Sequence, residues 1–298
     1  MGHSALNLRT TRHLALRLGI SEGWLTRLAA DVERHVTPER MRKKSGGFRR
    51  IYKPSPELKQ VQRVISTELL QPLPLPDALH GSVPGRSAKT NAQCHTGKPV
   101  VLSLDIKDFY PSVRFDHVYD LYVDLGCSPD VARMLASLTT FDGHLAQGFP
   151  TSPAIANLIL AEVVPRLSKL CSDHGLTFTL YQDDLTISGG HRIPAFINLF
   201  CRIFRQCGFE VNDRKVKIAD GGTRQEVTGF VVNAKVNVSK AEYRTLRALI
   251  HRCRVRGIEN VADRPMDQFK SHVRGRIQRV IYVNPNRGNR LLDQFLEL

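Results

Sequence analysis

The spacing of apolar residues along the chain predicts both helices and strands. Apolar side chains recur every three to four residues between positions 57 and 71, which indicates an amphipathic helix ended by the proline-rich stretch 71–76. The run PVVLSLDI at 99–106 is rich in Val, Leu and Ile, as is typical of a buried strand. Residues 176–189 alternate between apolar and polar on both sides of positions 182–184, which predicts a β-hairpin with these three residues at its tip.

Other patterned segments add two hairpins and more helices. Residues 226–239 predict a hairpin with Asn233 and Ala234 at its turn, and a glycine pair between basic flanks predicts a basic hairpin over 41–54. Two short periodic stretches within 14–30 are typical either of two packing helices or of a helix-turn-helix that reads DNA. Helical spacing also occurs at 115–125, 129–138, about 153–170, 194–207 and 239–298.

Positive charge is concentrated at the two ends of this 298-residue chain. Residues 1–60 carry 13 basic and 5 acidic side chains, residues 239–298 carry 13 and 6, and residues 61–238 carry 17 of each sign. The net charge of +15 is therefore not an even surface charge that serves solubility. Two basic flanks can instead neutralise phosphates on either side of a central groove. With 42% hydrophobic residues the chain is no disordered tail, so we expect a folded protein that binds an acidic polymer.

Membrane and disulfide classes do not fit the sequence. No run approaches the roughly 18 consecutive apolar residues of a membrane span, and the N-terminus lacks an apolar signal core. We therefore expect a cytoplasmic protein without a membrane partner. The six cysteines show no CxxC spacing, which argues against a zinc ribbon or a disulfide framework and favours reduced thiols.

Three aspartates are the strongest candidates for chemistry. Asp105 ends an apolar strand, and Asp183 and Asp184 lie at the tip of a hairpin. If these strands are neighbours, three carboxylates come within a few ångströms, and their repulsion is tolerable only when cations neutralise it. Hard oxygen ligands suit Mg²⁺, and two ions roughly 4 Å apart are suited to phosphoryl transfer. An Asp-Asp pair alone is also typical of an Asx-type turn.

Four segments, in the order found in reverse transcriptases, resemble the motifs of that family. The resemblance extends over about residues 38–298 and rests on SLDIKDFYPSV (103–113), QGFPTSPAIANLIL (147–160), LYQDDL (180–185) and EVNDRKVKI (210–218). It implies that Asp105 and Asp183 bind two Mg²⁺ ions, that Asp184 completes the site, and that the backbone carbonyl of Ile106 faces a metal.

The same resemblance implies a site for dNTPs, formed by Lys44, Arg49, Tyr110, Gln147, Gly148 and Lys215. Tyr110 corresponds to an aromatic gate that excludes the 2′-hydroxyl of a ribonucleotide, although a core tyrosine is the simpler alternative. Lys44 and Arg49 correspond to residues that grip the triphosphate. Gln147 and Gly148 correspond to a loop that contacts nucleotide and template, and Lys215 to a lysine near the phosphates, with a solvated lysine as its alternative.

Two further segments resemble the bacterial retron branch: NAQCH at 91–95 and VTG at 227–229. Gln182 departs from the alanine that is common there. The resemblance implies a structured noncoding RNA that serves as template and primer, and DNA synthesis from the 2′-hydroxyl of an internal guanosine. The product would be a branched RNA–DNA hybrid, used with an effector protein in antiphage defence. We assign RNA binding to Asn91, His95, Arg252, Arg254 and Arg256.

The expected fold is α+β, a right-hand polymerase with fingers at 1–98, a ferredoxin-like palm at 99–238 and a helical thumb at 239–298. We expect no RNase H, maturation or endonuclease domain after the thumb. Two alternatives stay open at this point. One is another compact bacterial reverse transcriptase, of the abortive-infection or diversity-generating type. The other is a transcriptional regulator that uses the helix-turn-helix pattern at 14–30.

Overall fold

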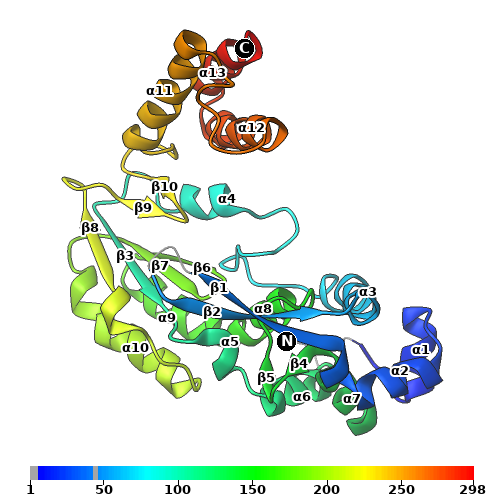
Figure 1. Cartoon of the computed structure of the whole chain (residues 1–298). Helices are drawn as coiled ribbons and strands as arrows, with labels where there is room; N and C mark the ends of the chain where they lie inside the picture. The colour runs from blue at the N-terminus through cyan, green and yellow to red at the C-terminus, as the bar shows by residue number, and fades with distance from the viewer. Residues whose placement is uncertain (1–5, 43–45) are drawn as a thin grey trace.

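A four-stranded antiparallel sheet lies at the centre of the computed structural model, which describes residues 6–42 and 46–298 (Figure 1). In sheet order the strands are β6 (Thr177–Tyr181), β7 (Asp184–Gly189), β3 (Val100–Asp105) and β8 (Lys217–Asp220). The chain runs strand, helices, strand, strand, helix, strand, so the sheet order is second, third, first, fourth. This is the βαββαβ topology of ferredoxin-like domains, and it confirms the strand predicted at 99–106 and the hairpin at 176–189.

The two faces of this sheet differ in polarity because side chains alternate along each strand. Leu104, Leu185 and Ile187 lie in the main core together with residues of α9 (Val164–Asp173) and α10 (Ile197–Gln206). The other face carries polar residues at the alternate positions, including Ser103, Asp105, Asp184, Thr186 and Ser188. Strand periodicity alone therefore places two of the aspartates on the polar face of the sheet.

Helices and one long hairpin surround the sheet in Figure 1, most of them around its lower part, with α4 (Ala88–Gln93) beside β9 (Glu226–Val227) and β10 (Phe230–Val231). The basic hairpin and the helices predicted at 57–71, 115–125, 129–138 and 194–207 are confirmed, and the N-terminal helix pair packs on α7 through buried leucines. These elements are α1 (Thr11–Leu18), α2 (Glu22–Ala30), β1 (Val36–Arg42), β2 (Phe48–Pro54), α3 (Pro56–Ile65), α4 (Ala88–Gln93), α5 (Phe109–Ser112), α6 (Phe115–Asp124), α7 (Pro129–Thr139), β4 (Thr140–Phe141) and β5 (His144–Leu145).

The helix expected at about 153–170 is two helices. Helix α8 (Ser152–Leu160) ends before a turn, and α9 begins at Val164. Pro165 lies in the first turn of α9, where its missing N–H costs nothing. Inside a continuous helix the same proline would remove a backbone hydrogen bond and clash with the preceding turn, so the helix breaks here.

The segment expected to form one hairpin at 226–239 contains two turns. Strands β9 (Glu226–Val227) and β10 (Phe230–Val231) are joined through Thr228 and Gly229, whose φ values are 47° and 78°. Positive φ at both central positions is the type I′ geometry that matches strand twist. The predicted turn at Asn233–Ala234 is confirmed as a second reversal of the chain, because Val231 and Asn237 on either side of it exchange backbone hydrogen bonds at 2.8 and 3.0 Å.

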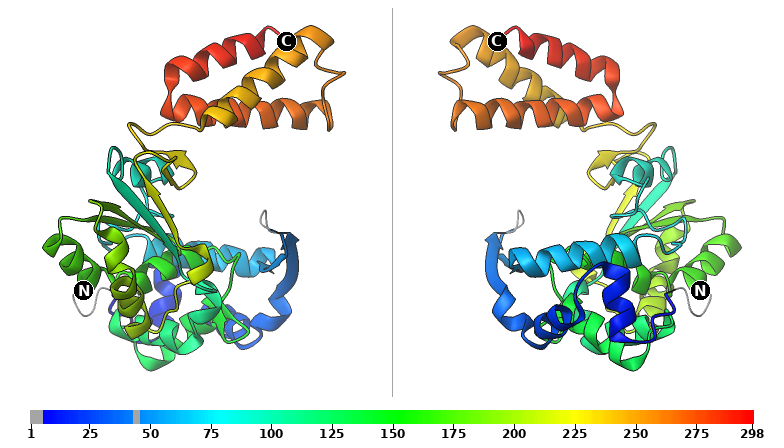
Figure 2. Two further views of the ribbon diagram at one scale, coloured as in Figure 1. Left: turned by 90° about the vertical axis from the view of Figure 1, so that its left-hand side faces the viewer. Right: turned by 90° about the vertical axis from the view of Figure 1, so that its right-hand side faces the viewer.

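The C-terminal residues form a three-helix bundle with its own core. Its helices are α11 (Lys240–Arg256), α12 (Met266–Val283) and α13 (Pro285–Leu296), as helical spacing predicted. Their core continues through β9 and β10 to α4. Figure 2 shows this bundle above the sheet, facing the β1–β2 hairpin. In the described part of the chain, no helix is both long and apolar enough for a membrane span.

Candidate active site

Three carboxylates meet at one end of the central sheet. Asp105 is the last residue of β3, and its cross-strand partner is Asp184, the first residue of β7. Asp183 precedes Asp184 at the tip of the β6–β7 hairpin, and its backbone carbonyl accepts a hydrogen bond from the N–H of Ile106 at 3.0 Å. The expectation that these two strands are neighbours is confirmed.

Burial and nearby negative charge disfavour the charged forms of Asp183 and Asp184. Burial, followed by the charges of Asp183 and Asp105, raises the pKa of Asp184 to about 6. Burial also raises the pKa of Asp183, and the nearby charge of Asp105 adds to this. The site therefore favours a cation close to the aspartates.

Lys215 supplies one such cation. Its Nζ donates to both carboxylate oxygens of Asp105, at 2.8 and 2.9 Å. The bond to Asp105 raises the pKa of Lys215, so the ammonium stays charged. Sequence reasoning placed this lysine near phosphates, and the structure places it on an aspartate at the floor of a cavity.

The three aspartate carboxylates line two different surface cavities. Asp105, Ile106 and Asp183 line one cavity, whereas Asp184 lines another beside Lys217. Among residues 6–42 and 46–298, no three His, Cys, Asp or Glu side chains converge as a ready-made metal cage. Asp105 and Asp183 nonetheless fit a hard divalent cation, because both carboxylates face one cavity and Asp105 already binds a cationic group.

The cavity beside Asp105 and Asp183 has a volume of about 390 Å³ and a mixed polar lining. Arg49 from β2, Gln147 from the loop before α8, and Lys215 all line it. Sequence reasoning missed several further polar residues there. Two of them are close to predicted ones: Arg50 is next to Arg49, and Asn212 precedes Lys215 by three positions. Lys44 lies outside the described residues.

Gly148 is fixed by a close backbone contact. The N–H of Tyr52 donates to the carbonyl of Gln147 at 2.7 Å, which joins β2 to the loop before α8. Gly148 has a φ of 115°, and a Cβ there would lie 2.5 Å from the carbonyl oxygen of Tyr52. Only glycine fits, and it keeps the wall formed by Gln147 against the hairpin.

Gly148→Ala is expected to lower the kcat/KM for dNTP incorporation by about tenfold or more, because the methyl group must push β2 away from the loop. Steady-state kinetics on an annealed primer–template measures this. Gly175→Ala is the matched control, since Gly175 also has a positive φ but no atom within 4 Å of the added Cβ. Equal effects of both variants would mean that backbone strain, not the contact with Tyr52, limits the reaction.

Tyr110 lies beside the cavity in contact with the hairpin tip. Its neighbours Phe109 and Pro111 line the cavity, and its ring packs edge-on against Phe109 with centroids 5.6 Å apart. The Tyr110 hydroxyl donates to Oε1 of Gln182 at 2.7 Å. Burial raises the pKa of Tyr110 to about 12, so the hydroxyl remains a donor.

The structure contradicts the RNA-binding role expected for Asn91 and His95, because both are buried. The two ring nitrogens of His95 each lie 2.7 Å from a hydroxyl, one of Ser188 and one of Thr179. One nitrogen donates and the other accepts, so the ring ties the end of α4 to β6 and β7. Burial lowers the pKa of His95 to about 3, which keeps it neutral.

This burial predicts a pH-dependent stability. The unfolded chain protonates His95 near its ordinary pKa of 6.5, and the folded chain only near 3, so stability falls as the pH drops through this window. The loss between pH 8 and pH 5 is expected to be about 2 kcal/mol. Urea unfolding across this range should show a shallower pH slope for His95→Asn than for the natural chain. An identical slope would assign the effect to another group.

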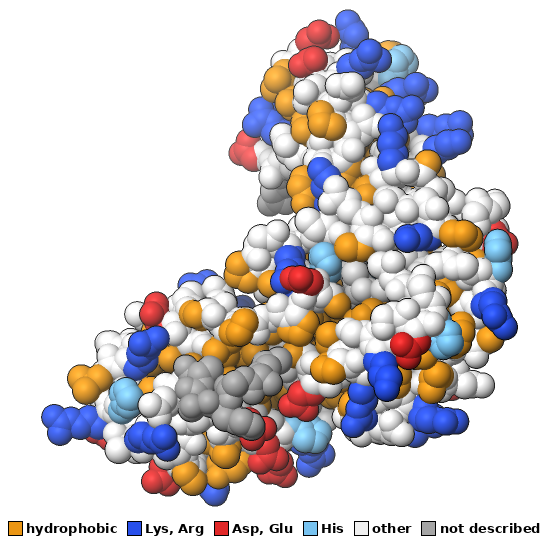
Figure 3. All heavy atoms as spheres, turned by 180° about the vertical axis from the view of Figure 1, so that it is seen from behind, with side chains coloured by type: hydrophobic (Ala, Val, Ile, Leu, Met, Phe, Trp, Pro, Cys, Tyr) orange, Lys and Arg blue, Asp and Glu red, His pale blue; other side chains and the backbone are white. Residues whose placement is uncertain are grey.

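The remaining RNA-binding candidates are exposed on the three-helix bundle. Arg252, Arg254 and Arg256 all lie on the surface of α11, and the first two line a hollow of about 510 Å³ together with Arg244 and Arg247. Figure 3 shows Lys and Arg side chains gathered on the bundle. This part of the chain presents a basic surface.

Comparisons with known proteins decide the family. The family model described as "Reverse transcriptase (RNA-dependent DNA polymerase)" matches residues 41–248. The chain is 36% identical to the Retron Mx65 reverse transcriptase of Myxococcus xanthus, over 95% of this chain and 70% of that protein. The Retron Mx162 reverse transcriptase of the same organism is 33% identical, over 98% of this chain and 67% of that protein. The chain belongs to the retron reverse transcriptases.

A solved structure supports the fold of this reverse transcriptase. Apo telomerase from Candida tropicalis superposes with a TM-score of 0.54 at 9% identity, over 88% of this chain and 58% of the telomerase chain. The expected right-hand polymerase fold of the α+β class is thereby confirmed. As a retron-type enzyme it is an RNA-directed DNA polymerase, and its family uses a divalent metal cation, typically Mg²⁺. The compact alternatives and the DNA-binding regulator are set aside.

Proposed function

We propose that this retron reverse transcriptase copies part of a structured noncoding RNA into DNA, beginning at the 2′-hydroxyl of an internal guanosine of that RNA. The observation that carries the proposal is the shared cavity. Asp105 and Asp183 line the same cavity as Arg49 and Lys215, so one space offers carboxylates to a metal and cations to a triphosphate. A dNTP is therefore the substrate that fits the cavity.

Asp105 and Asp183 would hold two Mg²⁺ ions, with Asp184 and the carbonyl of Ile106 completing the metal site. When bound, the ions supply activation of the attacking hydroxyl and stabilisation of the leaving pyrophosphate. Lys215 would exchange its contact with Asp105 for the phosphates of the nucleotide. Its raised pKa keeps it charged for this role.

The other residues around the cavity would bind and select the nucleotide. Arg49 would hold the triphosphate through its forked guanidinium, and we assign the same role to Lys44, which is outside the described residues. Gln147 and Gly148 would form the wall that meets nucleotide and template. Tyr110 would exclude the 2′-hydroxyl of a ribonucleotide by its bulk.

The wider assignment follows the hand-like architecture. Residues 1–98 would act as fingers, 99–238 as palm and 239–298 as thumb, with Arg252, Arg254 and Arg256 holding the folded RNA. The exposed arginines of α11 support this, because folded RNA is bound largely through shape and phosphate contacts. We further propose that the branched product acts with an effector protein in antiphage defence.

The linkage between RNA and DNA tests the proposal. DNA made by the protein in cells should stay attached to RNA through a 2′,5′ bond, and RNase treatment should leave a short branched stub. Debranching enzyme should then release the DNA with a measurable shift on a denaturing gel. DNA with a free 5′ end, made only from an added oligonucleotide primer, would instead indicate a reverse transcriptase with conventional priming.

A further inference from the structure

Gln182 occupies a constrained position between the catalytic hairpin and Tyr110. It lies at the tip between β6 and β7 with a φ of 57°, a left-handed conformation that is uncommon for a side chain of this kind. Its Oε1 accepts the hydrogen bond from the Tyr110 hydroxyl at 2.7 Å. The two side chains come from segments 72 positions apart, so tertiary packing alone brings them together.

Gly81 is in close contact with Gln182. A Cβ on Gly81 would lie 2.5 Å from the backbone nitrogen of Gln182 and 2.9 Å from its Cγ, so these two segments of the chain are in direct contact. The Gly81 carbonyl accepts a hydrogen bond from the buried Nδ2 of Asn157 at 2.7 Å. The contact surface against Gln182 is therefore anchored to α8.

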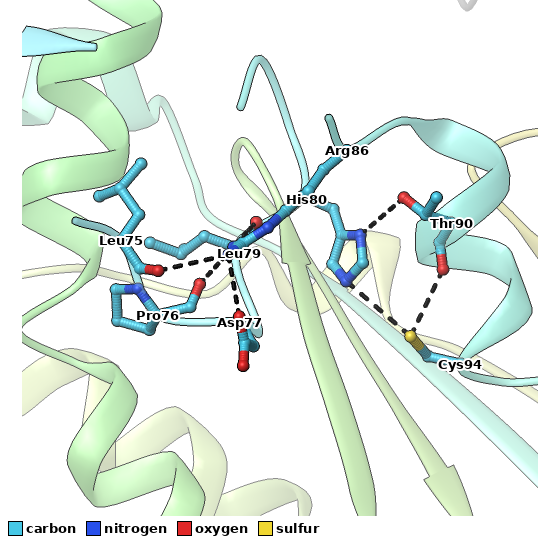
Figure 4. Close-up of polar contacts among 8 residues, drawn as sticks. All are labelled: Leu75, Pro76, Asp77, Leu79, His80, Arg86, Thr90 and Cys94. Atoms are coloured by element: carbon cyan, nitrogen blue, oxygen red, sulfur yellow. Dashed lines mark hydrogen bonds and ion pairs between the residues drawn. The ribbon is translucent and has the colours of Figure 1, made fainter. Parts of the chain in front are cut away.

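Several polar contacts hold the loop that leads to Gly81, and Figure 4 shows those made by Arg86 and His80. The Arg86 guanidinium donates to the carbonyl of Leu79 at 2.7 Å and to a carboxylate oxygen of Asp77 at 3.0 Å, and it also reaches the carbonyls of Leu75 and Pro76. A ring nitrogen of His80 lies 3.0 Å from the hydroxyl of Thr90 on α4. One arginine thus satisfies several carbonyls of the turn and limits its motion.

The same loop is bonded to the strand that leads to Gln182. The N–H of His80 donates to the carbonyl of Leu180 at 2.8 Å, and the N–H of Leu180 donates to the carbonyl of Ala78 at 2.7 Å. Loop and strand therefore move together. The Gln182 side chain therefore packs against the Gly81 loop, and its Oε1 points to the Tyr110 hydroxyl.

We propose that Gln182 is a positioning residue for sugar selection: it anchors the hydroxyl of Tyr110 and so holds the aromatic ring at a fixed place beside the nucleotide cavity. This inference rests on the proposed role of Tyr110 in excluding ribonucleotides. The ring packs on Phe109 along one edge, and its hydroxyl end is bonded to Gln182. Without that bond the ring can shift away from the cavity and admit a 2′-hydroxyl.

The experiment compares the ratio of dNTP to rNTP incorporation efficiency in four variants. Tyr110→Phe and Gln182→Met each remove one partner of the hydrogen bond with little change of size, and each is expected to lower the ratio by about three- to tenfold. The double variant should fall no further than either single one, because both remove the same bond. Tyr110→Val, which removes the ring itself, should lower the ratio by at least tenfold.

A loss of folding in the variants is not expected to explain a lower ratio of dNTP to rNTP incorporation. Nε2 of Gln182 is buried and has no hydrogen-bond partner among the described residues, so a thioether there relieves one unsatisfied donor while it loses the bond to Tyr110. Gln60→Met, an identical change on the exposed surface of α3, is the matched control and should leave the ratio unchanged. Thermal unfolding of all variants verifies that they are folded.

Each outcome has a distinct meaning. Additive losses in the double variant would show that Gln182 acts through another contact, such as the primer end, and would overturn the inference. A loss with Tyr110→Val but none with Gln182→Met would also overturn it, while the role of Tyr110 would stand. An unchanged ratio with Tyr110→Val would reject the gate itself and with it that part of the proposed function.

Discussion

Asp183→Asn, and separately Asp105→Asn, are expected to lower DNA synthesis with Mg²⁺ by about a thousandfold or more. Asparagine keeps the shape of the side chain but loses the charge that captures the metal ions, and the ions contribute several kcal/mol to the reaction. Single-nucleotide extension of an annealed primer, followed on a denaturing gel, measures the loss. RNA binding should persist, because the basic surface of α11 is not altered.

Loss of folding would not explain this result. Burial and repulsion already raise the pKa of Asp183, so a neutral isostere removes an unfavourable charge and should not lower the melting temperature of the metal-free protein. Asp173→Asn, on the exposed end of α9, is the control and should extend the primer normally. Extension at near the natural rate by either catalytic variant would contradict the metal assignment.

The second large effect concerns the RNA. Replacing Arg252, Arg254 and Arg256 together with Gln is expected to weaken binding of the cognate RNA by well over tenfold near physiological salt. Each lost phosphate contact removes about one unit from the log–log dependence of affinity on salt, so the slope should flatten by roughly two to three units. Filter binding or fluorescence anisotropy across a salt series measures both quantities.

A charge-matched variant distinguishes local contact from net charge. Arg192, Arg202 and Arg205 are exposed on and before α10, away from the bundle in Figure 1, and their replacement with Gln removes the same total charge. This control should change affinity and salt slope much less. Extension of a generic primer–template should stay comparatively intact in the α11 variant. If the α11 variant binds the RNA with unchanged affinity, the N-terminal basic region becomes the candidate for RNA recognition.

Local pattern in the sequence determined much of this protein. The period-two alternation of 176–189 and the apolar run at 99–106 placed Asp105 and Asp184 at strand ends on one face, because alternate residues of a strand face opposite sides of the sheet. Helical spacing likewise located α3, α6, α7 and the C-terminal helices. The ordered motifs then led to the right enzyme family, since they combine residue type with spacing.

Only the tertiary structure decided what lies against each residue. His95 in its motif resembled an RNA contact, yet it is buried with its ring nitrogens against hydroxyls of Ser188 on β7 and Thr179 on β6. Arg279 was one of many arginines in a basic segment, but it pairs with Glu242 at 3.1 Å and lies 4.3 Å from the ring of Phe230. Periodicity reports which face of an element is buried and carries no information about its partner.

The contact between Tyr110 and Gln182 has the same origin. Both residues were visible in the sequence as parts of separate motifs, and Gly81 carried no signal at all. Their juxtaposition depends on the β6–β7 hairpin, the turn after β3 and the loop held by Arg86 coming together. Such contacts join segments distant in the chain, so the packing of the whole fold sets them and no local pattern encodes them.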